Sequence, residues 1–202
     1  MGQEAVCRAR VDGADAEGKA LLETEEIIFR GPPRLALRFR DITGIDVRGA
    51  TLELRGDGRL LELELGAQAE RWAEKIRNPR TLADKLGVKP GMDIRAIGVV
   101  DAAALAEIEA RGGRITPDWP EAACDMVLLA IDEPVHLPAL ERARGAIKKD
   151  GAVWAVHPKG RKDLRDVDVM AAGKAALLVD NKVVKFSESH SALRFVIPRS
   201  MR

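Results

Sequence analysis

Apolar and polar residues alternate in short runs along the first 65 residues, and Gly, Asp and Pro interrupt these runs. A period of two is typical of β-strands joined by tight turns. In the pair 51–54 and 60–65, leucines occupy one side, charged residues occupy the other, and 56–59 form the turn. We therefore expect seven strands, at 5–11, 19–23, 26–29, 34–39, 44–47, 51–54 and 60–65.

The period changes to that of a helix directly after the last of these strands. Within 67–76, apolar residues follow the i, i+3, i+4, i+7 spacing of an amphipathic helix, at Ala69, Trp72, Ala73 and Ile76. Seven short strands followed by one such helix resemble the pleckstrin-homology-like (PH-like) fold, a bent barrel closed by its C-terminal helix. The resemblance covers about residues 3–78 and lies in the architecture, because no residue motif carries it. A small unrelated barrel is the alternative.

The segment 78–81 is the expected domain junction, because Pro79 disfavours helix at Asn78 and the periodicity differs on its two sides. We expect a PH-like β-barrel with its closing helix at 1–79 and a second domain at 80–202. The first domain has 13 basic and 15 acidic residues and the second has 20 and 17, a net charge of −2 and +3. Neither charge by itself predicts a polyanionic partner.

Strands and helices alternate in the second half of the chain. The segments 125–131 and 152–156 are continuous apolar runs, which is typical of strands covered on both faces. We expect further strands at 94–100, 114–116, 182–186 and 192–197, and helical segments at 82–86, 102–110, 138–147 and 167–177. This alternation predicts an α/β domain with a mainly parallel sheet and helices on its faces.

Two resemblances follow from this half. The run from Asp125, through the turn at Asp150 and Gly151, to a closing hairpin resembles the C-terminal half of class I S-adenosylmethionine-dependent methyltransferases, which implies a Rossmann-like domain. The whole chain also resembles an uncharacterised bacterial family of unknown function. The residues that carry this second resemblance are Trp154, Pro158, Lys159, Gly160, Phe186, Ser187 and 191–196.

The methyltransferase resemblance fails at the loop that would hold the cofactor. A nucleotide-like cofactor needs a glycine-rich turn after the first strand, where backbone approaches it closely. Here Gly98 is followed by the β-branched Val99 and Val100, and only about 25 residues separate this strand from Asp125. We therefore expect a degenerate domain with a truncated sheet that binds no cofactor, S-adenosylmethionine included.

The segment after the strand 152–156 is the strongest candidate for ligand binding. It carries Lys159, Gly160, Arg161 and Lys162 just before a predicted helix, at the carboxyl edge of the sheet, where open α/β folds bind ligands. These residues could hold a phosphate or carboxylate by charge and by backbone N–H groups. The alternative is a solvated loop in which Pro158 ends the strand.

A weaker candidate for acid–base chemistry is the pair of Asp132 and His157, which would share this edge. The alternative is that Asp132 caps the following helix. The serines beside His190 lack a Gly-x-Ser-x-Gly motif and are expected to form a hairpin loop. The three histidines and two cysteines lack metal-ligand spacing, so no metal site is expected.

Composition limits the partners. The net charge is +1, from 33 Lys and Arg against 32 Asp and Glu, and aromatic residues make up 3% of the chain with no Tyr. Nucleic acid is therefore an unexpected partner, although basic residues gather within 142–165. The chain shows neither a signal-peptide pattern at its start nor an uncharged run near 20 residues, so we expect a cytoplasmic protein without membrane contact.

These observations favour a non-catalytic binding or regulatory protein over an enzyme. Its barrel would offer a surface to a protein or peptide, and the segment 158–162 would hold a small anion. The alternative is a divergent transferase that acts on a small substrate through Asp132, His157 and Lys159.

Overall fold

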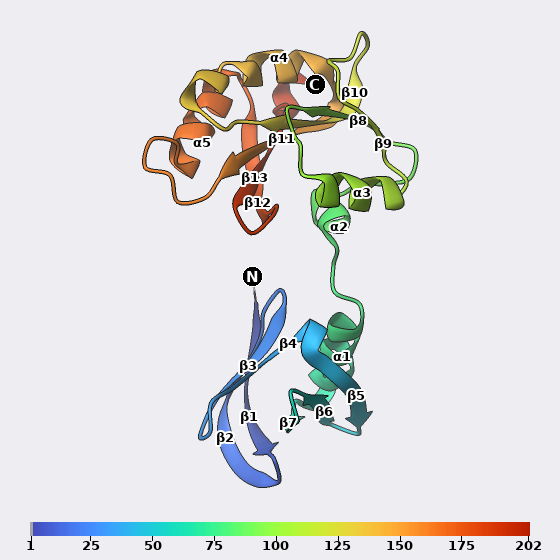
Figure 1. Cartoon of the computed structure of the whole chain (residues 1–202), viewed down its shortest axis with the longest axis vertical. Coiled ribbons are helices and arrows are strands. Elements are labelled where there is room, and N and C mark those ends of the chain that lie inside the picture. The colour runs from blue at the N-terminus through green and yellow to red at the C-terminus, as the bar shows by residue number, and fades with distance from the viewer. Residues whose placement is uncertain (1) are drawn as a thin grey trace. The chain divides into compact units, whose positions relative to one another are not determined.

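The computed structural model describes residues 2–202, which form two compact units, the first ending at Arg80 and the second running from Thr81 to Arg202 (Figure 1). We call them unit 1 and unit 2 and describe each by itself. Within the described residues, no helix has the length and apolar character needed to cross a bilayer.

Unit 1 contains the seven expected strands in one antiparallel sheet. Their order across the sheet is β4-β3-β2-β1-β7-β6-β5, so β1 joins a four-stranded half to a three-stranded half. The sheet is nearly closed. The strands are β1 (Gln3–Val11), β2 (Ala14–Leu22), β3 (Glu26–Arg30), β4 (Leu35–Arg38), β5 (Ile42–Arg48), β6 (Thr51–Gly56) and β7 (Arg59–Glu64).

The turn between β1 and β2 forms hydrogen bonds with β7, and these bonds link the two halves of the sheet. Asp12 and Gly13 both have positive φ, at 52° and 86°, as the two central residues of a tight hairpin require. The Asp12 carboxylate accepts hydrogen bonds from the Leu60 N–H at 2.8 Å and from Arg59 Nε at 2.5 Å. These two bonds, that from Leu60 first, lower the pKa of Asp12.

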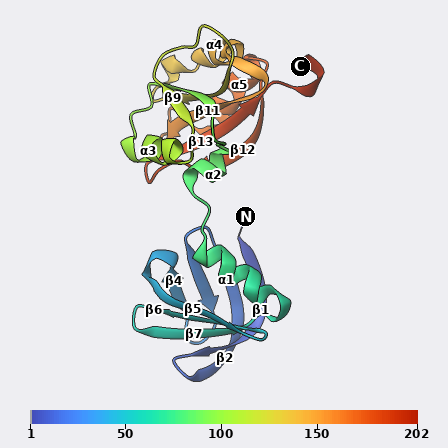
Figure 2. The same ribbon diagram turned by 90° about the vertical axis from the view of Figure 1, so that its right-hand side faces the viewer.

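The amphipathic helix is α1 (Ala69–Arg77), which lies against the sheet in Figure 2. Its buried residues are those that the spacing indicated: Ala69, Trp72, Ala73 and Ile76. Trp72 is fully buried among leucines and isoleucines of the strands, so the helix supplies part of the only core cluster described in this unit.

Unit 2 is a six-stranded sheet with the order β12-β13-β11-β10-β8-β9. The four strands β9, β8, β10 and β11 are parallel, and β13 is antiparallel to both β11 and β12. The strands are β8 (Asp93–Ile97), β9 (Arg114–Thr116), β10 (Cys124–Ala130), β11 (Ile147–Pro158), β12 (Val179–Lys185) and β13 (His190–Val196).

Helices cover both faces of this sheet (Figures 1 and 2). On one face α4 (Ala139–Ala146) and α5 (Asp166–Ala175) pack on β10, β11 and β13. On the other, α2 (Leu82–Leu86) and α3 (Ala102–Ala110) pack around the fully buried Trp154. This arrangement is Rossmann-like, as expected.

Several boundaries differ from the expected ones: the strand expected at 19–23 begins at Ala14, the strand expected at 182–186 begins at Val179, and two further differences lie in the parallel part of the sheet in unit 2. The strand expected at 94–100 ends at Ile97, because Gly98 has φ +72° and its Cβ, if present, would lie 3.3 Å from Ala130 Cβ. Asp150 and Gly151 belong to β11 itself, and an irregularity in the pairing with β10 falls beside them. The turn expected at Asp150 is therefore a kink within a longer strand.

The order of the sheet has a consequence for function. After β8 the chain runs to β9 on one side, and then returns to place β10 on the other side. In open α/β sheets, ligands bind outside the carboxyl ends of the strands at such a switch point.

Candidate functional site

The candidate site is the carboxyl edge of the sheet in unit 2. We use the name "the rim" for the segments at this edge: 98–101 after β8, 131–136 after β10, 157–166 at the end of β11 and beyond, and the turn 186–190 between β12 and β13. Hydrogen bonds connect the last three of these segments.

The segment after β8 is shaped by local packing. Val99 is buried, whereas the Val100 side chain is 90% exposed. Asp101 Oδ1 accepts a hydrogen bond from the Ala104 N–H at 3.0 Å and caps α3. Gly98 is the one residue between this strand and α3 with positive φ.

Asp132 is the centre of the contacts at the rim. Its backbone carbonyl accepts a hydrogen bond from Arg161 Nη1 at 2.7 Å, and its N–H donates to His136 Nδ1 at 3.3 Å. Its carboxylate Oδ1 lies 3.7 Å from His190 Nε2. Two hydrogen bonds thus hold the backbone of Asp132. Its side chain is exposed, and the carboxylate points toward the imidazole of His190.

Ser189 approaches the other nitrogen of the same imidazole. Ser189 Oγ is 2.8 Å from His190 Nδ1, and Ser187 Oγ accepts a hydrogen bond from the His190 N–H at 3.2 Å. The His190 side chain is 33% exposed. The ring therefore lies between a serine hydroxyl and the Asp132 carboxylate, in reach of solvent.

His157 is the one buried ionisable side chain at the rim among the described residues. Its side chain is 1% exposed, and neither ring nitrogen has a hydrogen-bond partner. Nε2 lies 3.6 Å from Oδ1 of Asp166, the first residue of α5. Burial lowers the pKa of His157, and the nearby Asp166 carboxylate opposes this change in part.

The cations expected to hold an anion are partly engaged by the chain itself. Lys159 Nζ donates to the carbonyls of Ser187 at 2.6 Å and of Glu188 at 3.2 Å. Arg161 binds the Asp163 carboxylate, which raises the pKa of Arg161. Lys162 is exposed, and Gly160 has φ +73° at the turn before it. Lys159 and Arg161 thus join the loops of the rim, and Lys162 is the loop cation that faces solvent.

The structure brings Asp132 and His157 to the same edge of the sheet. The histidines that Asp132 contacts, however, are His190 and His136. The Asp132 side chain caps no helix, since Glu133 occupies the N-cap of the following 3₁₀ turn, η3 (Pro134–His136), without a side-chain bond. The sequence does not predict His190 as the partner of Asp132, because this contact depends on the register of β13 on β11, which pairs His190 with Pro158.

Metal ligands are not grouped in the part of the chain that the structure describes: no three of His, Cys, Asp or Glu could hold an ion together. Cys7 and Cys124 are free thiols, and burial raises the pKa of each.

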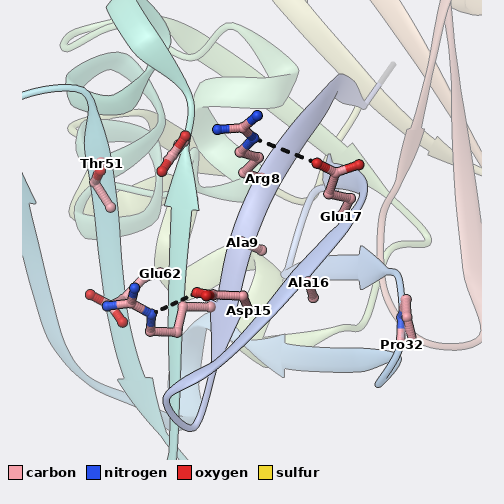
Figure 3. A pocket seen from close by; sticks show the side chains of 10 residues that line it. Arg8, Ala9, Asp15, Ala16, Glu17, Pro32, Thr51 and Glu62 are labelled. Carbon is pink, nitrogen blue, oxygen red and sulfur yellow. Dashed lines mark hydrogen bonds and ion pairs between the residues drawn. The ribbon is translucent and has the colours of Figure 1, made fainter.

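Unit 1 carries a cavity of about 670 Å³ (Figure 3). Its two arginines are paired with its own acids, Arg8 with Glu17 at 3.5 Å and Arg10 with Asp15 at 3.0 Å. Glu62 and Glu64 add two further carboxylates from β7. The surface is therefore polar, with an excess of negative charge.

No protein-family model and no curated protein matches the chain, so the resemblance to an uncharacterised bacterial family stays a prediction. Solved structures do match, among them a TehB-like SAM-dependent methyltransferase from Corynebacterium glutamicum, at 14% identity and TM-score 0.41, covering 64% of this chain and 96% of that one. A fibrillarin pre-rRNA processing protein from Methanococcus jannaschii matches at 13% identity and TM-score 0.45, covering 78% and 98%. A SAM-dependent methyltransferase from Aquifex aeolicus matches at 13% and 0.44, covering 57% and 87%.

These matches correct one expectation. The prediction of a non-catalytic binding or regulatory protein is wrong, because the similar structures include several methyltransferases and the alternative, a divergent transferase, fits them better. The likeness concerns a methyltransferase-like fold. A shared fold assigns no role to an individual residue of this chain.

Proposed function

We propose that unit 2 is a divergent transferase that moves a group onto a small nucleophilic substrate held at the rim. The observation that carries this proposal is the approach of the Asp132 carboxylate to within 3.7 Å of His190 Nε2 at the carboxyl edge of the sheet. Imidazole and carboxylate groups are among the side chains that general acid–base catalysis uses.

Asp132 is the residue assigned to take the proton from the nucleophile of the substrate. Its backbone is held by Arg161 and His136, so its carboxylate keeps one position relative to a bound molecule. His190, with the Ser189 hydroxyl at its Nδ1 and the Asp132 carboxylate 3.7 Å from its Nε2, limits the orientation of that carboxylate. His157 acts as a positioning residue, because its buried ring lies against the first residue of α5.

The segment 159–162 is proposed to hold an anionic group of the substrate. Lys162 supplies an exposed charge four residues before α5, whose own first turn carries the carboxylates of Asp166 and Asp168. Gly160 allows the turn that brings this charge to the edge, and Lys159 and Arg161 keep the turn attached to its neighbours. An anionic group at this position would leave a nucleophile of the same molecule in reach of Asp132.

The group donor is expected to be recognised by charge. The loop 98–101 offers one glycine, with Val99 buried behind it and Val100 exposed, so close backbone approach to an adenosine-type cofactor is limited. We therefore expect S-adenosylmethionine to bind weakly, with a dissociation constant above about 100 μM.

Unit 1 is proposed to be a PH-like barrel, an assignment supported by the strand order β4-β3-β2-β1-β7-β6-β5 and by α1 after it. Its partner would be a protein or peptide. A peptide with basic side chains would complement Glu62 and Glu64 in the cavity of Figure 3. The proposed domain boundaries remain 1–79 and 80–202.

The test of the transferase is a label-transfer assay with the full chain. Isotopically labelled S-adenosylmethionine, acyl thioesters and nucleotide sugars are each incubated with a mixture of small metabolites, and products are detected by mass spectrometry. We expect transfer from at least one donor, and a loss of about 100-fold or more in Asp132→Asn. Asp57→Asn is the matched control, because Asp57 occupies a turn of unit 1 with φ 51°, which Asn tolerates. No transfer from any donor, or equal rates in Asp132→Asn, would contradict the proposal.

A further inference from the structure

A second cavity in unit 2 lies at the amino end of the sheet, away from the rim. It has a volume of about 220 Å³ and opens beside the end of α2 and the starts of β10 and β11. Its charged lining residues are Asp125, Asp150, Lys182 and Arg194, and its apolar ones are Leu86, Met92, Met126 and Ala152.

The two cations are neighbours on one face of the sheet. Lys182 on β12 is the register partner of Arg194 on β13, and directly opposite residues of an antiparallel pair project to the same side. A single small anion at this face can contact both cations. Lys182 Nζ donates to the carbonyl of Lys85.

Arg194 lacks a carboxylate partner within the described residues. Its Nη1 donates a hydrogen bond to Asn181 Oδ1 at 3.2 Å, and it forms no ion pair within 4.0 Å. The side chain is half-buried, and burial, with a smaller effect of Arg202, lowers the pKa of Arg194. A guanidinium withdrawn from water without a counterion leaves a planar set of donors that suits a carboxylate.

The acids of this cavity differ in how they are engaged. Asp125 accepts hydrogen bonds from Lys148 Nζ at 2.6 Å and from the Asp93 N–H at 2.8 Å, which lower its pKa. Asp150 is exposed at the start of β11 and makes no ion pair in the described chain. The cavity thus presents cationic donors on the side of β12 and β13 and a carboxylate on the side of β11.

We propose that this cavity binds a small zwitterion of the α-amino acid class with an aliphatic side chain. The carboxylate would lie on Arg194 and Lys182, the ammonium on Asp150, and the side chain on Leu86, Met92 and Met126. A volume of about 220 Å³ admits a molecule of this size. A simple anion would contact Arg194 and Lys182 alone, whereas a zwitterion also contacts Asp150. This site is independent of the rim and of the transferase activity.

The test uses amide NMR of the ¹⁵N-labelled full chain titrated with L-leucine and L-methionine. We expect saturable shifts around 181–182 and 194, with dissociation constants in about the micromolar to millimolar range. Two matched probes separate the charges: 4-methylpentanoate keeps the carboxylate, and 3-methylbutylamine keeps the ammonium. Each should bind at least about tenfold more weakly than L-leucine, because each loses one charge-assisted contact.

Arg194→Gln should weaken L-leucine binding by about tenfold or more, and Arg199→Gln, outside the cavity lining, should not change it. The amide spectrum of each variant shows whether it is folded. If Arg194→Gln is not folded, Asp150→Asn replaces it, with the same expected loss. Absence of saturable shifts, equal binding of 4-methylpentanoate, or undiminished binding in a folded variant would overturn the proposal.

Discussion

At the residue scale, the most consequential side chain is His157. An imidazole that is 1% exposed, with no hydrogen-bond partner on either nitrogen, is held in a place that disfavours its charged form. Burial at the end of a central strand could be anticipated from the apolar run before it. The contact with Asp166 could not, because it depends on where the loop 159–165 returns the chain.

This burial predicts a pH dependence of stability. The pKa of His157 lies below its ordinary value of 6.5, so the folded protein binds fewer protons at this site than the unfolded chain. The contribution of His157 to the free energy of unfolding is therefore fully present above pH 6.5 and declines as the pH falls toward the folded-state pKa.

Urea unfolding of the wild type and of His157→Leu between about pH 7.5 and 5 measures this effect. The variant should lose less stability than the wild type over this range, because the other two histidines are common to both chains. Parallel pH profiles for the two proteins would show that His157 is not the group responsible.

The residue scale also shows where the sequence was insufficient. Asp132 and His157 were expected at one edge, and the α/β alternation was enough to place them there. The contact of Asp132 with His190 required the antiparallel register of β13 on β11, which hydrophobic pattern alone does not specify.

At the element scale, close contacts between helices and strands set the geometry behind the rim. Gly173 lies in α5, and a Cβ built there would meet Phe195 Cε1 at 2.1 Å. Phe195 on β13 is fully buried, so its ring has little room to move. Because Gly173 has no side chain, α5, which begins at the rim, can pack directly against Phe195 of β13.

Two glycine-to-alanine substitutions in the helices of unit 2 are expected to change the stability of the protein in opposite directions. Gly173→Ala should destabilise the protein by about 1–3 kcal/mol, as overpacking of a core does. Gly145→Ala should stabilise it by about 0.5–1 kcal/mol, because Gly145 lies within α4 with open space around its Cβ position. Thermal and urea unfolding measure both. Stabilisation by Gly173→Ala would show that α5 does not approach β13 so closely.

Elements were easier to foresee than their limits. The alternation of leucines and charges indicated β6 and β7, and the spacing of Trp72 and Ile76 indicated α1. The strand β8 was extended too far, because Val99 and Val100 have strand propensity while the conformation of Gly98 ends the strand. The left-handed conformation of a single glycine decides this boundary, and the hydrophobic pattern does not indicate it.

At the scale of the whole molecule, the candidate site lies in unit 2, where the sheet has its switch point between β8 and β10. Loops after β10, β11 and β12 meet there through Arg161, Lys159 and His190. The proposed transferase depends on this edge, and the proposed zwitterion site depends on the opposite one. Binding experiments on the full chain can therefore separate the two.

The most direct test of the rim as the substrate site is a titration of the ¹⁵N-labelled full chain with inorganic phosphate and, separately, with S-adenosylmethionine. The ring signals of His157 and His190 and the amides of 159–168 are followed. Phosphate should shift these signals, and the shifts should fade as salt is raised, because exposed charges are screened. S-adenosylmethionine should shift them less at the same concentration. Rim signals that stay unchanged while saturable shifts appear elsewhere would contradict the account.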